Sequence, residues 1–185
     1  LSALKREGYD KVFGLDIEAN AINFCEKAGL NVSRLDSTDL RNPFNFKFDI
    51  VILTHVLEHV KRDEIISTLY FIRNKLLKVD GKLLIAVPNA QSNTDCYWMY
   101  EDWTHTTLFT SGSLYYVLKA SGFNSIDFLD IDCTLEIKGV LKKTIRKIFL
   151  KIYILNKRFW NKITSSSYHK PSPDIYSYEI KCKAG

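Results

Sequence analysis

Short runs of apolar residues alternate with longer segments in which apolar residues recur every three or four positions, and this pattern continues through residue 131. The runs predict β-strands, and the spacing of three or four predicts amphipathic α-helices. Strands are expected at residues 11–16, 31–35, 48–53, 82–87 and within 123–131, and helices at 18–29, 63–78 and 110–121. Because the two kinds of element alternate, we predict an α/β fold with a parallel, doubly wound sheet and helices on both faces.

Several boundaries and one strand can be predicted in more detail. The run FDIVIL at residues 48–53 is apolar almost without a break, which is typical of a strand covered by helices on both faces. Asp80 and Gly81 are expected to form the turn that ends the preceding helix. A Ser or Thr cap and a glycine stop at Gly122 are expected to bound the helix at 110–121.

The segment at residues 138–162 differs in charge from the rest of the chain. It carries nine basic residues and no acidic one, and its apolar residues recur at helical spacing, so we predict a basic amphipathic helix or helix pair. It could pack on the sheet with its Lys and Arg side chains in solvent. Alternatively, its cationic face, with Phe159 and Trp160, could contact an anionic membrane surface or a phosphate-bearing acceptor. No recognised nucleic-acid-binding module is present, so nucleic acid is the least favoured partner. Residues 175–183 alternate as a final strand.

Composition is that of a globular protein. The 185 residues are 46% apolar and 25% charged, and a chain of this length can bury one substantial core. We expect a single domain, with a core at 1–137, a basic insertion at 138–173 and the last strand at 174–185. The net charge is −5 over residues 1–137 and +10 over the remainder, so the basic character bears on partners rather than on the fold.

Cysteine spacing and hydropathy bear on the compartment. The four cysteines lie far apart, with no CxxC pair and no Cys/His cluster at zinc-ligand spacing. No apolar stretch is long enough to span a membrane, and the first ten residues, LSALKREGYD, do not resemble a signal peptide. We therefore expect reduced thiols in a cytoplasmic protein, and peripheral membrane contact through 138–162 is one of the alternatives given above for that segment.

Acidic turns follow two of the expected strands, at the sheet edge where open α/β folds bind ligands. Asp16 ends the first strand, where its carboxylate could accept two hydrogen bonds from a ribose diol or could cap the next helix. Asp36 and Ser37 follow the second strand, where they could hold an adenine ring or could simply form a turn. The residues alone leave both alternatives open.

The segment THVLEHV follows the third strand. Its two histidines, His55 and His59, are four residues apart and would share one face of a helix, as two ligands of a metal ion do. No third ligand of suitable type stands close by in the sequence. We therefore predict no metal at this pair.

Five motifs follow one another in order: Gly14-Leu15-Asp16, Asp36 to Leu40, Phe48 to Val60, Asn74 to Asn89, and Asp102 to Phe123. They resemble the GxD, Dxxdl, FDxVxxxxVLEHV, LxPGGxLxxxxPN and late HxxxF[ST] patterns of class I methyltransferases that depend on S-adenosylmethionine (SAM). The resemblance covers residues 1–131. It implies a Rossmann-like fold, SAM as cofactor and S-adenosylhomocysteine (SAH) as product.

The same resemblance implies roles for individual residues. On the cofactor, Asp16 would bind the ribose, Asp36 and Ser37 the adenine, and Thr54 and His55 would line the methionine side. Ile17 is a further expected cofactor-binding residue.

Methyl transfer to a hydroxyl or amine also needs a group that takes up a proton, and an imidazole titrates near neutrality. His59 and His105 are therefore candidate bases, the alternative being that they cap, pack or hold a loop. Tyr97, Trp98 and Trp103 would form an acceptor pocket, or would pack as a lid or on the surface.

One part of the family pattern is expected upstream of this sequence. The glycine-rich loop, D-x-G-x-G-x-G, would immediately precede Leu1, and the strand before it would lie at the centre of the sheet, between the strands that end at Asp16 and Leu53. We therefore expect the natural protein to have a further N-terminal segment of some tens of residues.

The leading hypothesis is a methyltransferase that acts on an oxygen or nitrogen of a small or lipid- or sugar-linked acceptor. The alternative is a non-catalytic binding or scaffold module that lacks the glycine loop. A nicotinamide-dependent enzyme would share the acid at Asp16 but would leave the LEHV turn unexplained.

Overall fold

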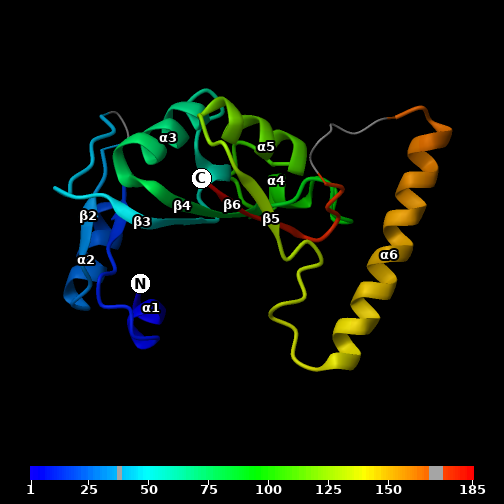
Figure 1. Cartoon of the computed structure of the whole chain (residues 1–185), viewed down its shortest axis with the longest axis horizontal. Helices are drawn as coiled ribbons and strands as arrows, with labels where there is room; N and C mark the ends of the chain where they lie inside the picture. The colour runs from blue at the N-terminus through cyan, green and yellow to red at the C-terminus, as the bar shows by residue number, and fades with distance from the viewer. Residues whose placement is uncertain (37–38, 167–172) are drawn as a thin grey trace. The chain divides into compact units, whose positions relative to one another are not determined.

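The computed structural model describes residues 1–36, 39–166 and 173–185. The chain divides into two compact units, Leu1–Lys47 and Phe48–Gly185, and each unit is described by itself (Figure 1). The expected single domain over 1–185 stays a prediction.

The first unit is a small parallel sheet with a connecting helix. α1 (Ser2–Arg6) precedes β1 (Gly14–Asp16), and α2 (Ala19–Lys27) connects β1 to the parallel strand β2 (Val32–Arg34). Gly29 follows α2 with a backbone φ of +69°, a conformation that glycine adopts without steric cost. The strand–helix–strand order predicted for this region is confirmed, with shorter strands than expected.

The second unit contains a four-stranded sheet with the order β3-β4-β6-β5. Its strands are β3 (Phe48–Thr54), β4 (Leu77–Pro88), β5 (Ile126–Leu129) and β6 (Glu179–Ala184). β3 and β4 are parallel, as the alternation of elements predicts, whereas β6 is antiparallel to both of its neighbours. The sheet is therefore mixed, and a strand from late in the sequence lies between two earlier ones.

Two helices, α3 (Ile65–Phe71) and α5 (Ser111–Ala120), lie on one face of this sheet (Figure 1). Side chains buried where the helices meet the strands include Leu69, Leu83, Val87, Leu114, Leu118 and Ile180. In β3, by contrast, Ile50 and Ile52 are 54% and 50% exposed. Successive side chains of a strand point to opposite faces, so Ile50 and Ile52 lie on the same face of β3. That face is partly exposed, whereas the apolar run at 48–53 predicted that helices cover both faces.

The helix predicted at 63–78 ends earlier than expected. α3 passes into one π-helical turn, η2 (Ile72–Leu76), and β4 begins directly after it. Asp80 and Gly81 therefore do not form a turn that ends the helix; they lie inside β4, where its pairing with β3 shifts in register. A Cβ at Gly81 would lie only 3.0 Å from the Phe48 carbonyl oxygen, so the glycine permits this close approach at an irregular point of the ladder.

The helix predicted at 110–121 is confirmed as α5, including both of its ends. The Thr110 hydroxyl accepts a hydrogen bond from the Ser113 N–H at 3.1 Å, and the Ser113 hydroxyl accepts one from the Thr110 N–H at 2.9 Å. This reciprocal pair is a capping box. Gly122 follows the helix with φ of +92°.

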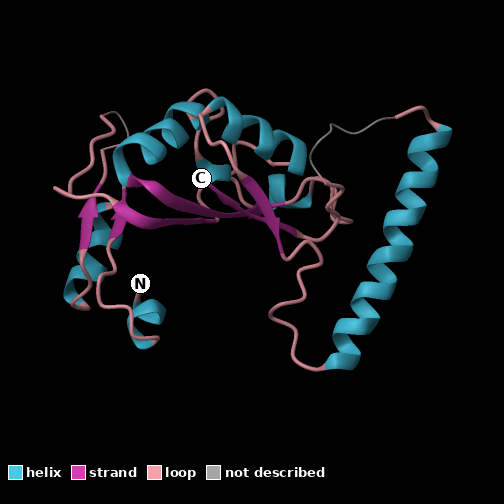
Figure 2. Cartoon of the chain, in the orientation of Figure 1, coloured by secondary structure: helices cyan, strands magenta, loops and turns pink. Residues whose placement is uncertain are grey.

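The basic segment forms one helix, α6 (Val140–Ile163), rather than a pair (Figure 2). The final strand, β6, begins at Glu179, later than the predicted start at residue 175. A short helix, α4 (Tyr97–Glu101), lies in the loop after β4. Among the helices of the described residues, none is both long enough and apolar enough to cross a membrane.

Candidate functional site

The chain turns sharply after β3 and enters η1 (Leu57–His59), a single turn of 3₁₀-helix. The His55 N–H donates to the Ala86 carbonyl oxygen of β4 at 2.9 Å, and His55 has a backbone φ of +51°, in the left-handed region. Leu57 is fully buried and anchors the turn in the core. Thr54 and His55, predicted to line the methionine side of the cofactor, therefore lie on a firmly held turn at the carboxyl end of β3.

The His55 ring lies between two carboxylates. Its Nε2 is 2.8 Å from Glu179 Oε1, and its Nδ1 is 3.2 Å from Glu58 Oε1. The other oxygen of Glu179 lies 3.2 Å from Lys181 Nζ. Burial opposes protonation of the Lys181 amine, but the hydrogen bond to Glu179 and the charge of that carboxylate outweigh it, so the pKa of Lys181 is raised. His55 thus belongs to a network of polar and ionisable side chains that joins the turn to β6.

The tautomer of His59 follows from its hydrogen bonds. Its Nδ1 lies 2.8 Å from Thr104 Oγ1, and the Thr104 hydroxyl donates its proton to Asp102 Oδ1 at 2.6 Å. The hydrogen bonds from the Thr104 hydroxyl and backbone N–H hold the pKa of Asp102 below its usual value. Because the Thr104 proton is used on Asp102, the Thr104 oxygen accepts from His59 Nδ1–H, and the Nε2 of a neutral His59 carries a free lone pair.

His105 has the same tautomer for a different reason. Its Nδ1 lies 2.6 Å from the Trp98 carbonyl oxygen, which can only accept, so Nδ1 carries the proton. The His105 side chain is only 7% exposed, and its ring lies 4.6 Å from the His59 ring, centroid to centroid. The loop that carries it is tied to η1, because the Thr106 N–H donates to the Glu58 carbonyl oxygen at 2.8 Å.

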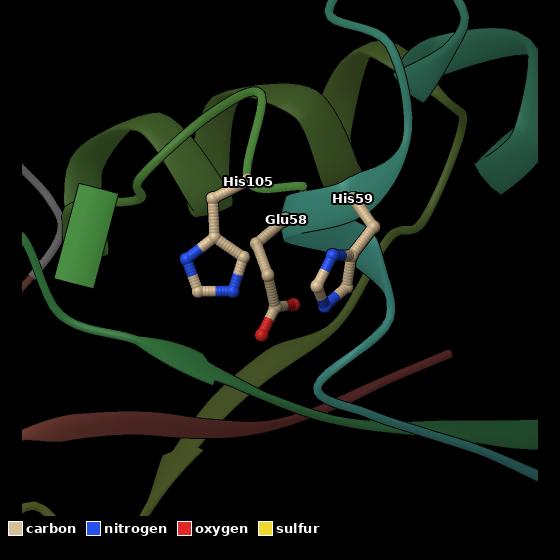
Figure 3. Close-up of side chains that lie close together, drawn as sticks. All are labelled: Glu58, His59 and His105. Atoms are coloured by element: carbon tan, nitrogen blue, oxygen red, sulfur yellow. The ribbon is translucent and has the colours of Figure 1, made fainter. Parts of the chain in front are cut away.

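The Glu58 side chain lies between the two rings (Figure 3). It is fully buried, and its Oε2 has no hydrogen-bond partner among the described residues. One ligand atom each from Glu58, His59 and His105 can be chosen so that all three lie within 4.8 Å of one another. The structure thus brings together the two histidines that the sequence proposed as bases and adds a carboxylate between them.

The residues predicted to bind ribose and adenine lie in the first unit. Asp16 ends β1, and its Oδ1 accepts a hydrogen bond from the Glu18 N–H at 2.9 Å, whereas Glu18 itself is the N-cap of α2. Ile17 is exposed. Asp36 follows β2 at the same edge as Asp16, because β1 and β2 are parallel. Ser37 lies outside the described residues.

The aromatic residues predicted to form an acceptor pocket are less closely grouped. The rings of Tyr97 and Trp98 on α4 meet edge to face with centroids 5.1 Å apart, whereas Trp103 is 92% exposed. The clearest contact from this group to the site is the Trp98 carbonyl that fixes His105. The pocket stays a prediction.

Sequence reasoning missed Glu58, Asp102 and Thr104. Glu58 stands within VLEHV, directly before the candidate base His59. Its position in a recognised motif could have indicated that it belongs to the site. In the string Asp102-Trp103-Thr104, the Asp102 side chain accepts a hydrogen bond from the backbone N–H two residues later, which makes an Asx turn. Asp is one of the residues that commonly begin such a turn. The buried position of Glu58 was not visible, because it depends on the loop around His105.

A family model described as a methyltransferase domain matches residues 1–127. The chain belongs to this methyltransferase family. A search among curated proteins found no match.

Solved structures show the fold of this methyltransferase domain. It is similar to a SAM-dependent methyltransferase from Archaeoglobus fulgidus, with 20% identity, a TM-score of 0.63, and coverage of 99% of this chain and 79% of that one. It is also similar to a SAM-dependent methyltransferase from Mesorhizobium loti, with 14% identity, a TM-score of 0.58, and coverage of 99% and 83%. PigF, solved with SAH, matches at 13% identity and a TM-score of 0.53 over 70% of this chain and 43% of PigF. The predicted Rossmann-like α/β fold is confirmed.

Proposed function

We propose that this methyltransferase domain uses SAM to methylate an oxygen or nitrogen atom of a small or lipid- or sugar-linked acceptor. The observation that carries the proposal is the pair of imidazoles on either side of Glu58, each with its Nδ1 proton engaged and its Nε2 without a hydrogen bond among the described residues; Asp102 Oδ2 lies 3.8 Å from Nε2 of His105. SAM as donor is supported by the family and by PigF, a structural neighbour solved with SAH.

The residues divide the reaction between binding and proton transfer. Asp16, Ile17, Asp36 and Ser37 bind the ribose and adenine, and the turn at Thr54 and His55 faces the methionine side.

Methyl transfer is an in-line displacement, so the acceptor must be held in line with the sulfonium carbon. The new bond forms between the acceptor atom and the methyl carbon as the sulfur–methyl bond breaks, and Nε2 of His59 or His105 takes the acceptor's proton.

A calorimetric titration of SAH into the full-length protein tests the cofactor half of this proposal. We expect saturable binding, weakened by roughly 1–3 kcal/mol in Asp16→Asn because ribose hydroxyls lose a charged acceptor. Asparagine keeps an oxygen that can accept from the Glu18 N–H, so the start of α2 is preserved. Asp10→Asn, an exposed acid in the same unit, is the control and should bind SAH as the unmodified chain does. A folded sample that binds no SAH would contradict the proposal and favour a scaffold module.

We also propose that α6 is a peripheral membrane anchor for a protein of the cytoplasm. Within α6, eight exposed apolar side chains lie on one side, and Val140 and Trp160 are exposed as well; the eight are Leu141, Ile145, Ile148, Phe149, Ile152, Leu155, Phe159 and Ile163. Each is at least 46% exposed. The partly covered residues of α6, such as Lys143, Leu150 and Lys157, fall on the opposite side at 3.6 residues per turn.

Contacts and charge support this orientation. On the covered side, Arg146 Nε donates to the Asp132 carbonyl oxygen at 2.8 Å, and the rings of Tyr153 and Tyr176 meet at 5.7 Å. The apolar stripe therefore faces away from the contacts that hold the helix. With eight Lys and Arg and no acid in α6, the helix suits an anionic bilayer surface.

Cosedimentation with vesicles tests the anchor. The chain should sediment with vesicles that contain phosphatidylglycerol and stay in solution with pure phosphatidylcholine. The double variant Ile148→Ser/Ile152→Ser should lose sedimentation, whereas Asn156→Ser, an exposed polar position of the same helix, should keep it. Equal behaviour of the three proteins would exclude the apolar stripe as the contact.

A further inference from the structure

The cluster of Glu58, His59 and His105 has the composition of a metal site. The THVLEHV motif alone did not indicate one, because the third ligand stands far along the chain from it. We propose that these three side chains bind one divalent transition-metal ion, through the two Nε2 atoms and the free Glu58 oxygen. His55, paired with Glu179, is not one of the ligands.

The tautomers of both histidines suit this role. A histidine binds a metal through an unprotonated ring nitrogen, and its other nitrogen is usually held by a carboxylate, carbonyl or similar partner. His59 Nδ1 donates to Thr104, which is itself fixed by Asp102, and His105 Nδ1 donates to the Trp98 carbonyl. Neither Nε2 makes a hydrogen bond among the described residues, although Asp102 Oδ2 lies 3.8 Å from that of His105, and both ring orientations are fixed from behind.

Glu58 supplies the observation that is hardest to explain without a cation. Its side chain has no exposed surface, and Oε2 has no hydrogen-bond partner among the described residues. A buried carboxylate oxygen without a partner is unfavourable, and a bound divalent ion would compensate for it. The opposite oxygen, Oε1, faces His55 Nδ1 at 3.2 Å, so the carboxylate is also held from behind.

The geometry and the kind of ligand indicate which ions would fit. One ligand atom from each of the three side chains lies within 4.8 Å of one from each of the other two. An ion at about 2.0–2.2 Å from nitrogen and oxygen ligands holds them roughly 3–4 Å apart, so binding needs only a small inward movement of the side chains. Two imidazoles and one carboxylate suit zinc, cobalt, manganese or iron and leave coordination positions open.

The open positions give the ion a role that rests on the proposed methyl transfer. An acceptor hydroxyl bound to the ion would lose its proton to solvent more readily, because the cation stabilises the resulting oxyanion. That oxygen then forms the bond to the methyl carbon as the sulfur–methyl bond breaks, and SAM becomes SAH. In the metal-loaded protein the two imidazoles are ligands rather than bases.

Cobalt(II) provides a direct test of the site. Untagged protein is stripped with a chelator, titrated with Co²⁺ and followed by visible absorption. We expect saturation at one ion per chain and release of the colour by Zn²⁺. His59→Gln, His105→Gln and Glu58→Gln should each weaken binding by more than about 10-fold, because even the loss of a group behind a ligand costs about that much.

Two control variants test whether cobalt binds outside the cluster. Cys96→Ser removes an exposed thiol that could bind cobalt by itself, and Glu64→Gln removes a nearby partly exposed acid; both should bind Co²⁺ as the unmodified chain does. The His59 ring is only partly buried, so His59→Gln tests the site even if Glu58→Gln does not fold.

The outcomes are separable from those of the proposed function. No stoichiometric cobalt binding, or binding unchanged in His59→Gln and His105→Gln, would overturn the metal site whether or not the same samples bind SAH. Cobalt binding that depends on the three ligands, in full-length protein that does not bind SAH, would support the site and refute the methyltransferase proposal alone.

Discussion

The substitution Glu58→Gln should change stability in opposite directions with and without metal. In metal-free protein the glutamine keeps a carbonyl oxygen that can accept from His55 Nδ1, and it removes a buried negative charge. Its amide N–H groups can face the free Nε2 atoms of His59 and His105 in place of an oxygen that has no partner. An unsatisfied buried polar group costs about 1–3 kcal/mol, so we expect the free energy of unfolding to rise by ~1–2 kcal/mol. His55 is half exposed and keeps its contact with Glu179, so the substitution does not leave its ring without a partner.

Bound metal reverses the order of stability, so that Glu58→Gln becomes less stable than the unmodified chain. A ligand that binds only the folded state adds about 2.7 kcal/mol at a concentration about 100-fold above its Kd, and Glu58→Gln forfeits most of that gain. The assay is urea unfolding followed by circular dichroism, once with chelator and once with excess Co²⁺, for the unmodified chain, Glu58→Gln and the control Glu64→Gln. If Glu58→Gln is less stable than the unmodified chain by more than about 1 kcal/mol in chelator, the buried carboxylate stabilises the fold by itself and the reasoning is refuted.

Three further predictions concern the fold of the second unit. Burial raises the pKa of the Cys182 thiol from 9.0 to about 12, so above about pH 9 the folded state keeps a proton that the unfolded state loses. The free energy of unfolding should therefore fall by about 2 kcal/mol between about pH 8 and pH 10.5. Urea unfolding at these two pH values measures the decline, and Cys182→Ala should remove it. Thr110→Ala breaks the capping box of α5 and should lower the free energy of unfolding by about 0.5–2 kcal/mol; an unchanged denaturation midpoint would show that the cap contributes nothing. Gly81→Ala places a Cβ 3.0 Å from both the Lys78 backbone nitrogen and the Phe48 carbonyl oxygen, which should cost about 1–3 kcal/mol, and a variant of unchanged melting temperature would show that β4 relaxes freely there.

Local pattern was sufficient to predict most elements of the fold. Hydrophobic spacing identified α5 and α6, and the residues Thr110 and Gly122 marked the ends of α5 correctly. The boundary between α3 and β4 was wrong because it depends on a distant contact: Gly81 fits inside β4 only because the Phe48 carbonyl of β3 comes so close. Propensity within a short window contains no information about that contact.

The candidate site was predictable in its chemistry but not in its grouping. His59 and His105 were identified from motifs and from the pKa range of imidazole, and the structure places their rings side by side. The pairing of His55 with Glu179 depends on β6 lying against β4, which no local pattern indicates. The buried position of Glu58 likewise depends on the loop at Thr106, which donates to its backbone carbonyl.

The position of β6 has a consequence for how this protein folds. β6 lies between β4 and β5 and pairs with both, so those two strands are not joined until β6 has formed. A folding intermediate that lacks β6 would leave one edge of β4 and one edge of β5 open. Open strand edges invite pairing with other chains, so we expect such an intermediate to be prone to aggregation. Pairing of β6 closes both edges at once.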